Sequence, residues 1–195
     1  MPTPPVVLAS SSPRRAELLA QIGVSFRTVV PEVPEEVLPL ESPEAYVRRL
    51  AEDKAVAGLA LTEAPAVVVG SDTTVVLDDT ILGKPRHRAD ALDMLARLSG
   101  RSHRVMSAVA VTDHHGRCHS RVSISEVGFR SLSVAECEAY WETGEPVDKA
   151  GAYAIQGLAA VFVERLAGSY SGVMGLPLYE TAQLLQDFGV PILDP

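Results

Sequence analysis

The amino-acid sequence predicts an α/β fold built on a mixed β-sheet. Short apolar or alternating runs that are typical of strands are interleaved along the chain with segments that have the period of amphipathic helices. Two pairs of strand-like segments are joined by short polar turns, at Asp78-Asp79 and at residues 113–116 (DHHG), which indicates antiparallel hairpins. Helices between other strands indicate crossover connections, so we expect both parallel and antiparallel pairs in one sheet.

The first third of the chain contains two predicted strands and two predicted helices. Ser12 suits the N-cap of the first helix, Pro13 suits its first position, and Gly23 suits its end. The segment 31–43 contains four prolines and is rich in glutamate, so it is predicted to be a loop. The predicted order is a strand at 6–9, a helix from Pro13 to Gly23, a strand at 24–30, this loop, and a helix from Ser42-Pro43 to about Leu61.

The rest of the chain continues the alternation of strands and helices. Residues 66–71 form a continuous apolar run, as expected for a central strand, and the Gly/Ser-rich segment 167–175 is expected to be a loop. Ser133 and Glu136 have the spacing of a capping box at a helix start. The remaining predicted elements are a hairpin at 73–85, a helix at 89–99, strands at 104–112 and 119–130, a helix from Ser133 to Thr143, a strand at 160–166 and a final helix from about Leu178 to Phe188.

Length, charge and cysteine content narrow the class of protein. The 195 residues suffice for one domain or two closely joined lobes. A net charge of −8 argues against a broad nucleic-acid-binding surface, which needs clustered Lys and Arg. No apolar stretch reaches the roughly 20 residues of a membrane helix, no targeting segment is evident, and two cysteines make no disulfide framework. We expect a cytoplasmic protein that binds neither nucleic acid nor membranes and holds any anionic substrate in a local basic pocket or through a divalent cation.

Several familiar site patterns are absent or misleading. The chain has no P-loop and no dinucleotide-binding glycine pattern, and GSYSG at 168–172 has tyrosine where a nucleophile elbow requires serine. A cluster of three histidines and a cysteine has the residue types of a zinc site, but it falls on a predicted hairpin tip. Because side chains alternate between the faces of a strand, we expect this cluster to be scattered and to bind no zinc. Its members are His114, His115, Cys118 and His119.

Three polar segments remain as candidates for chemistry. The first is SSSPRR at residues 10–15, at a helix start, where free N–H groups, serine hydroxyls and the arginines Arg14 and Arg15 can hold an anion. An ordinary helix cap followed by two solvated arginines is the alternative interpretation.

The second candidate is Asp72, which directly follows the apolar run 66–71. We expect its carboxylate at the end of a strand and at the rim of the core, where burial raises a carboxyl pKa and a nearby cation lowers it. Such a group suits a general base or a metal ligand. A structural aspartate that caps the strand end is the alternative.

The third candidate is DKAGAYAIQG at residues 148–157, which combines Lys149 and Gln156 with small residues that permit close approach of a ligand. An ordinary surface loop is the alternative. Lys149 is one of only three lysines among seventeen basic residues, and all three lie beside small residues or proline. A lysine ammonium is a compact charge that can approach a single phosphate oxygen, so the three lysines are candidate phosphate ligands. The other two are Lys54 and Lys84.

Taken together, these segments resemble the Maf family of nucleotide pyrophosphatases. LASSSPRRAELL at 8–19 resembles the family pattern LASxSPRRxELL, and GSDTTVVLDDTILGKP at 70–85 resembles GADTxVxLDGxxLGKP. The segments at 97–111, 145–157 and 173–181 match in order and spacing as well. The resemblance spans residues 6–188 and implies an elongated mixed sheet flanked by helices, with two lobes around a deep cleft, similar to the inosine triphosphatase fold. It also implies a single such domain over residues 1–195.

The resemblance further implies hydrolysis of a nucleoside triphosphate to the monophosphate and pyrophosphate, with a divalent metal, usually Mg²⁺ or Mn²⁺. In this scheme Asp72 accepts the proton of the attacking water. Glu35 matches the family's acidic residue and, with Asp72, is the implied metal ligand, although Glu36 competes with Glu35 for that role. The residues implied to surround the triphosphate are Ser10, Ser12, Arg14, Lys54 and Lys84.

Three positions are implied to set the choice of base, namely Arg15, Thr73 and Gln156. These residues resemble the branch of the family that prefers dTTP and UTP, including modified uridine nucleotides. Ser71 departs from the alanine of that branch and slightly loosens the assignment. A homodimer is common in the family. Two rival functions are a non-catalytic nucleotide-binding regulator of septum formation and a phosphomonoesterase or nucleotidyltransferase that uses the same anion pocket.

Overall fold

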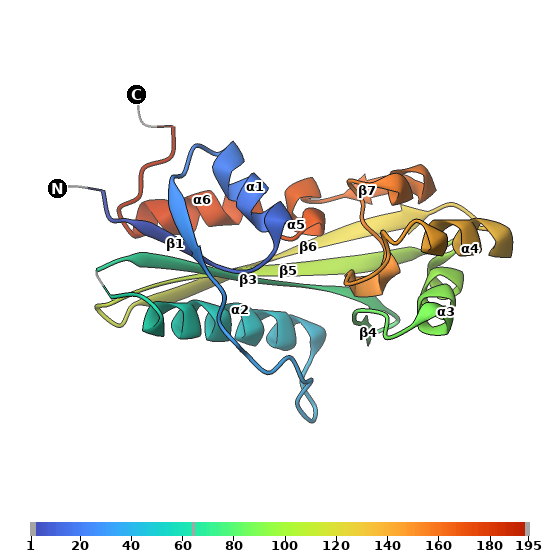
Figure 1. Cartoon of the computed structure of the whole chain (residues 1–195), viewed down its shortest axis with the longest axis horizontal. Helices are drawn as coiled ribbons and strands as arrows, with labels where there is room; N and C mark the ends of the chain where they lie inside the picture. Colours follow the sequence, from blue (N-terminus) through green and yellow to red (C-terminus); the bar gives the residue numbers. More distant parts are fainter. Residues whose placement is uncertain (1–2, 64, 194–195) are drawn as a thin grey trace.

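One mixed β-sheet runs through the whole molecule (Figure 1). The structure is a computed structural model that describes residues 3–63 and 65–193. The sheet has seven strands in the order β2-β1-β3-β5-β6-β7, and β4 pairs with β3 beside this path. The strands are β1 (Val6–Ala9), β2 (Phe26–Val29), β3 (Val67–Leu77), β4 (Thr80–Leu82), β5 (Ser102–Asp113), β6 (Cys118–Phe129) and β7 (Val163–Ala167).

The predicted mixture of strand directions is confirmed. β1 pairs in parallel with both β2 and β3, and the remaining pairs are antiparallel. The three long strands β3, β5 and β6 form the spine of the molecule, which gives it the elongated shape seen in Figure 1. The parallel pairs require crossovers, which α1 and α2 supply.

Helices cover the sheet differently at its two ends (Figure 1). At one end α2 packs on one face, where it meets β3 and β5, and α1 and α6 cover the other face. At the opposite end α3, α4 and the two 3₁₀ segments enclose a second core with β4. The helices are α1 (Pro13–Gln21), α2 (Pro43–Ala60), α3 (Arg88–Leu98), α4 (Val134–Glu142), α5 (Tyr170–Met174) and α6 (Leu178–Asp187), with 3₁₀ segments η1 (Ala150–Ala152) and η2 (Leu158–Phe162). No helix in the described residues is long and apolar enough to cross a membrane.

A glycine in β3 lets α2 approach the sheet closely. A Cβ atom at Gly70 would collide with the backbone oxygen of Ala51 and the backbone nitrogen of Ala55. Because Gly70 has no side chain, α2 can lie directly against β3 at this point. This contact sets the distance between the residues that α2 and β3 direct toward each other.

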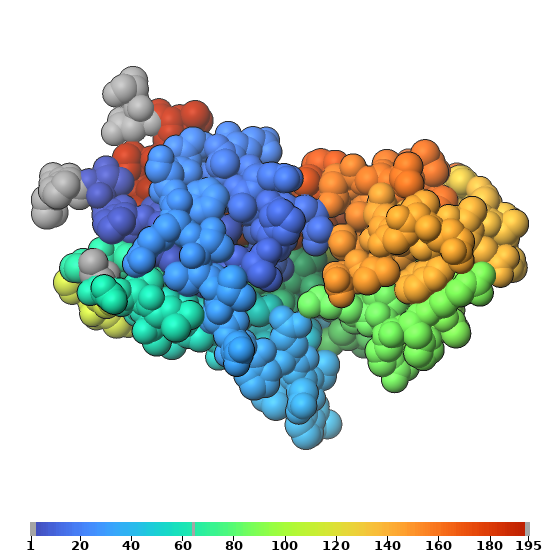
Figure 2. Space-filling view, in the orientation of Figure 1, coloured from blue at the N-terminus to red at the C-terminus, as the bar shows by residue number. Residues whose placement is uncertain are grey.

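β3 has a gap in its pairing on one side. β5 pairs with β3 continuously from Val67 to Val76. On the opposite side of β3, the pairing with β1 ends at Val69 and the pairing with β4 begins at Val75. Within the described residues no strand pairs with 70–74 on that side. The gap lies between the two ends of the molecule, and the space-filling view shows a hollow there between the N-terminal segments and the C-terminal ones (Figure 2).

Three element predictions need correction. The strand predicted at 66–71 does not end there, because pairing with β5 carries β3 on to Leu77 and satisfies its backbone; Asp72 therefore lies inside a strand rather than at its end. The strand predicted at 160–166 is only Val163–Ala167, preceded by η2. The segment 167–175, predicted to be a loop, contains α5, which Ser169 caps by accepting the Gly172 N–H.

Candidate active site

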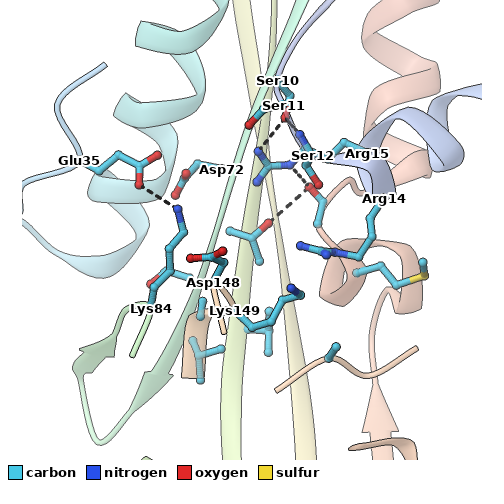
Figure 3. A pocket seen from close by; sticks show the side chains of 18 of the residues that line it. Ser10, Ser11, Ser12, Arg14, Arg15, Glu35, Asp72, Lys84, Asp148 and Lys149 are labelled. Atoms are coloured by element: carbon cyan, nitrogen blue, oxygen red, sulfur yellow. Dashed lines mark hydrogen bonds and ion pairs between the residues drawn. The ribbon is translucent and has the colours of Figure 1, made fainter. Parts of the chain in front are cut away.

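A cavity of about 730 Å³ occupies the gap beside β3 (Figure 3). Its walls come from the β1–α1 turn, the loop before α2, α2 itself, the middle of β3, the loop after β4, and the segments around η1 and α5. All the residues singled out from the sequence as site residues line it. They are Ser10, Ser12, Arg14, Arg15, Glu35, Lys54, Asp72, Thr73, Lys84 and Gln156.

A lysine between two carboxylates forms the centre of the site. The Lys54 Nζ atom lies 2.7 Å from Asp72 Oδ1 and 2.6 Å from Glu35 Oε1. Lys84 Nζ lies 3.5 Å from the other oxygen of Glu35. The side chains of Lys54 and Asp72 are only 12% and 10% exposed, so α2 and β3 hold this pair largely away from water.

The pKa values of Asp72 and Glu35 are shifted in opposite directions. Burial raises the pKa of Asp72 above its ordinary value, and the positive charges of Lys54 and Arg15 oppose this without cancelling it. Burial also acts to raise the pKa of Glu35, but hydrogen bonds and charges from Lys54 and Lys84 outweigh it and leave the pKa below its ordinary value. Asp72 is therefore the more basic of the two carboxylates.

The loop before α2 aims Glu35 into the cavity and leaves Glu36 outside it. The Tyr46 hydroxyl donates to the backbone oxygen of Glu35 at 3.1 Å, and Arg49 donates to the backbone oxygen of Glu36 at 3.0 Å. Burial, together with the charges of Asp72 and Glu35, raises the pKa of Tyr46 to about 12, so its hydroxyl stays protonated. Of the two glutamates, Glu35 lines the cavity, and the side chain of Glu36 is exposed.

The start of α1 differs in one respect from an ordinary cap. Ser12 occupies the N-cap position and Pro13 follows it, as predicted, but the Ser12 side chain makes no capping hydrogen bond. Instead the Ser10 hydroxyl accepts the Ser12 N–H at 3.1 Å. The Ser12 hydroxyl and the first N–H groups of α1 thus remain available on the cavity side for an anion.

The two adjacent arginines have different surroundings. Arg15 Nε donates to the backbone oxygen of Gly175 at 2.9 Å, and its Nη1 donates to Ser10 Oγ at 3.4 Å. The Arg14 guanidinium has no hydrogen bond or ion pair within the described residues and points into the cavity (Figure 3). Arg15 is therefore fixed in place by the protein, whereas Arg14 is free to meet a ligand.

The site residues implied by the family resemblance did not include Lys149, although the sequence had singled it out as a candidate phosphate ligand. Lys149 and Asp148 line the cavity, and the Lys149 side chain extends toward Arg14 (Figure 3). Burial and the charge of Arg14 lower the pKa of Lys149. The Gly151 N–H donates to the backbone oxygen of Gly83 at 3.0 Å, which ties the segment of Lys149 to the one that carries Lys84.

The donor set fits a hard divalent cation that is partly held by the substrate. Mg²⁺ is commonly bound by one or two carboxylates together with phosphate oxygens and water. Glu35 and Asp72 supply two carboxylates at the cavity, and the described residues contain no group of three or more histidine, cysteine or acidic side chains placed to hold a metal.

Sequence comparisons with known proteins agree on one protein family. Residues 5–188 match the family model described as Maf-like protein. A dTTP/UTP pyrophosphatase of Vibrio cholerae is 58% identical over 94% of this chain and 97% of its own length. A dTTP/UTP pyrophosphatase of Alkalilimnicola ehrlichii is 56% identical over 96% of this chain and 94% of its own. The Staphylococcus aureus Ham1 protein shares the fold, with a TM-score of 0.50 at 12% identity over 94% of this chain and 96% of that one.

Proposed function

Because this chain belongs to the family of Maf-like proteins, we propose that it is a pyrophosphatase that hydrolyses dTTP and UTP to the monophosphate and pyrophosphate. The family match and the curated relatives support the reaction type. The observation in the structure that carries the proposal best is the buried Asp72–Lys54 pair in a cavity that is also lined by Arg14, Arg15, Lys84 and Lys149.

The charges of the cavity complement a triphosphate. Arg14, Lys84 and Lys149 line the cavity from three different segments of the chain, and Lys54 lines it while paired with Asp72. A nucleoside triphosphate carries roughly four negative charges, and catalysis of its cleavage consists mainly of positioning and charge neutralisation. The cavity concentrates positive charge at one place in a chain whose net charge is −8.

Asp72 is the general base in this proposal. Its carboxylate takes a proton from water, and the resulting nucleophile attacks the α-phosphorus. The bond from the α-phosphorus to the bridging oxygen then breaks, and pyrophosphate leaves with the electron pair. Lys54, which donates to Asp72 at 2.7 Å, orients the carboxylate, and its positive charge opposes the rise in the pKa of Asp72 that burial causes. Arg14, Lys84 and Lys149 stabilise the negative charge that develops on the leaving pyrophosphate.

A divalent cation, Mg²⁺ or Mn²⁺, belongs to this proposal, with Glu35 and Asp72 as its protein ligands. When bound, such an ion neutralises phosphate charge and polarises the phosphorus centre. The protein's own residues would do the rest: Lys54 bridges the two carboxylates, and Tyr46 keeps the loop of Glu35 against α2.

Arg15, Thr73 and Gln156 form the proposed base-selecting group. Arg15 and Thr73 lie together at the backbone oxygen of Gly175, at 2.9 and 3.4 Å, and Gln156 lines the same cavity from an exposed position. A guanidinium, a hydroxyl and a carboxamide can together read the donors and acceptors on the edge of a base.

Family resemblance also supports a homodimer and a cytoplasmic location. Light scattering of the purified chain tests whether it is a homodimer.

A nucleotide panel tests the proposed function. The purified chain is assayed with dTTP, UTP, CTP, ATP and GTP in Mg²⁺ and in Mn²⁺, with pyrophosphate and orthophosphate measured separately. We expect pyrophosphate, with dTTP and UTP as the best substrates. Release of orthophosphate would identify a phosphomonoesterase instead, and binding without either product would identify a nucleotide-binding regulator.

A further inference from the structure

The hydroxyl of Thr73 takes part in a chain of hydrogen bonds whose directions can be assigned. Thr73 Oγ1 lies 2.7 Å from Ser107 Oγ, and Ser107 Oγ lies 2.5 Å from the backbone oxygen of Gly172. A carbonyl oxygen can only accept, and a hydroxyl has a single proton to donate. Ser107 therefore donates to Gly172, and the proton between the two hydroxyls has to come from Thr73.

The other acceptor near Thr73 does not change this assignment. The backbone oxygen of Gly175 lies 3.4 Å from Thr73 Oγ1, but it already accepts from Arg15 Nε at 2.9 Å and lies 2.9 Å from Ser71 Oγ. If Thr73 turned its proton toward Gly175, its oxygen and that of Ser107 would face each other at 2.7 Å with no proton between them. The proton of Thr73 thus points at Ser107, and only lone pairs remain for a ligand.

The neighbourhood of Thr73 suits a base rather than phosphates. Side chains alternate along a strand, so Thr73 lies on the opposite face of β3 from Asp72. On that side the cavity wall is formed by the apolar side chains of Val75, Val105, Val173 and Met174. A flat, uncharged ring is the part of a nucleotide that such a wall accommodates best.

We propose that Ser107 fixes the Thr73 hydroxyl as a hydrogen-bond acceptor, so that Thr73 reads the N3–H donor of uracil or thymine and Ser107 is a positioning residue for base choice. This inference rests on the proposed function and assigns a role to a residue outside the base-selecting group. Arg15, which can only donate, lies beside Thr73 at the Gly175 oxygen. A donor next to an acceptor matches a carbonyl next to an N–H, as on the edge of these two bases.

Cytosine is the base that this arrangement rejects. It has the size of uracil, but its N3 carries no hydrogen and is itself an acceptor. In the same pose, the lone pairs of Thr73 and of cytosine N3 would face each other without a proton. A buried polar group left unpaired in this way is a strong source of discrimination. Ser107 is 1% exposed, so water does not compete for its hydroxyl.

The test compares kcat/KM for UTP and CTP in the parent protein and in Ser107→Ala. Without Ser107 the Thr73 proton can turn into the cavity and donate to cytosine N3. We expect kcat/KM for CTP to rise about fivefold, the size of one neutral hydrogen bond, while that for UTP changes less than about twofold. Thr112→Val is the matched control. Thr112 is a buried residue of the same strand, its hydroxyl donates to the backbone oxygen of Arg117, and it does not line the cavity.

Two further variants keep the proposal testable should Ser107→Ala fail to fold. Thr73→Ser keeps the hydroxyl and should keep the parental UTP:CTP ratio, whereas Thr73→Val should lower the ratio about fivefold through a loss on UTP. An unchanged ratio in a folded Ser107→Ala, or in Thr73→Val, would overturn the proposal. Absence of pyrophosphate release from UTP and dTTP by the parent protein would instead overturn the proposed function itself, so the two failures are distinct.

Discussion

The Lys54 ammonium lies 2.7 Å from a carboxylate oxygen of Asp72, and the two side chains are only 12% and 10% exposed. Lys54 comes from α2 and Asp72 from β3, and the close approach of these elements at Gly70 brings the pair together. An ion pair held this far from water is not needed for folding as such, since apolar residues can fill the same space. Its position in the wall of a cation-lined cavity is the reason to assign it to catalysis.

Removing the lysine should destabilise the fold. Lys54→Met leaves Asp72 buried without its ion-pair partner, and we expect the free energy of unfolding to fall by about 3 kcal/mol. The matched control is Arg48→Met, since Arg48 pairs with Glu44 on the surface of the same helix and such pairs contribute about 0.5 kcal/mol or less. Urea denaturation at neutral pH measures both. Equal losses in the two variants would contradict the importance assigned to burial.

Substitutions at the two adjacent glutamates should have clearly different effects on activity. Glu35 points at Lys54 and Lys84 in the cavity, whereas the Glu36 side chain is exposed. We expect Glu35→Gln to lower kcat at least tenfold and to raise the concentration of Mg²⁺ needed for half-maximal activity, because a carboxylate ligand is lost. Glu36→Gln should change neither by more than about twofold, as is usual for an exposed side chain. A Mg²⁺ titration of both variants decides, and a larger effect at Glu36 would reverse the assignment.

Substitutions at the two adjacent arginines should change the kinetics in different ways. Arg14 reaches into the cavity without a partner among the residues that the structure describes, so Arg14→Ala should raise KM for every triphosphate by a similar factor, about tenfold, through the loss of one charged contact. Arg15 is held at Gly175 beside Thr73, so Arg15→Ala should alter the ratio of kcat/KM values among bases. Kinetics on the nucleotide panel measures both patterns. A uniform effect of Arg15→Ala across bases would remove Arg15 from the base-selecting group.

His103 should make stability depend on pH. Its side chain is buried, with 3% of the residue exposed, and its Nε2 atom forms a hydrogen bond with the Tyr153 hydroxyl. Burial lowers the pKa of His103 from 6.5 to about 4. The folded state therefore favours the neutral ring, and below pH 6.5 the unfolded state binds a proton first. The free energy of unfolding should fall by about 2.5 kcal/mol on going from pH 7.5 to pH 4.5 through this residue.

The comparison with His103→Gln isolates this contribution from that of the carboxyl groups, which titrate in the same range. Urea denaturation at both pH values should show a smaller loss in the variant than in the parent, by about the stated amount. Identical losses in the two proteins would show that His103 is not the source.

The sequence predicted the fold class and most of the elements because their signals are local. Ser133 and Glu136 cap α4 as a capping box, and the apolar period of α6 needs no knowledge of its partners. The full extent of β3 could not be predicted in the same way. Ser71, Asp72 and Thr73 interrupt its apolar run, and only the tertiary pairing with β5 keeps these polar residues in a strand.

For the candidate site, local motifs named the residues, but their relationships depend on the fold. The sequence could not decide between Glu35 and Glu36, because the choice depends on Tyr46 and Arg49 holding the backbone of that loop from another helix. It also did not connect Thr73 with Ser107, which lies on the neighbouring strand 34 positions away. Such contacts follow from register, and the register of β3 and β5 is set by the packing of the whole sheet.

The most direct test of the account is the rate of pyrophosphate release from UTP by Asp72→Asn. The substitution keeps the shape of the side chain and removes the basic group, so the account predicts at least a hundredfold fall in kcat with UTP binding retained. Asp78→Asn, at an exposed turn on the same hairpin, should keep the parental rate. A rate for Asp72→Asn within about threefold of the parental one would contradict the assignment of Asp72 as the general base.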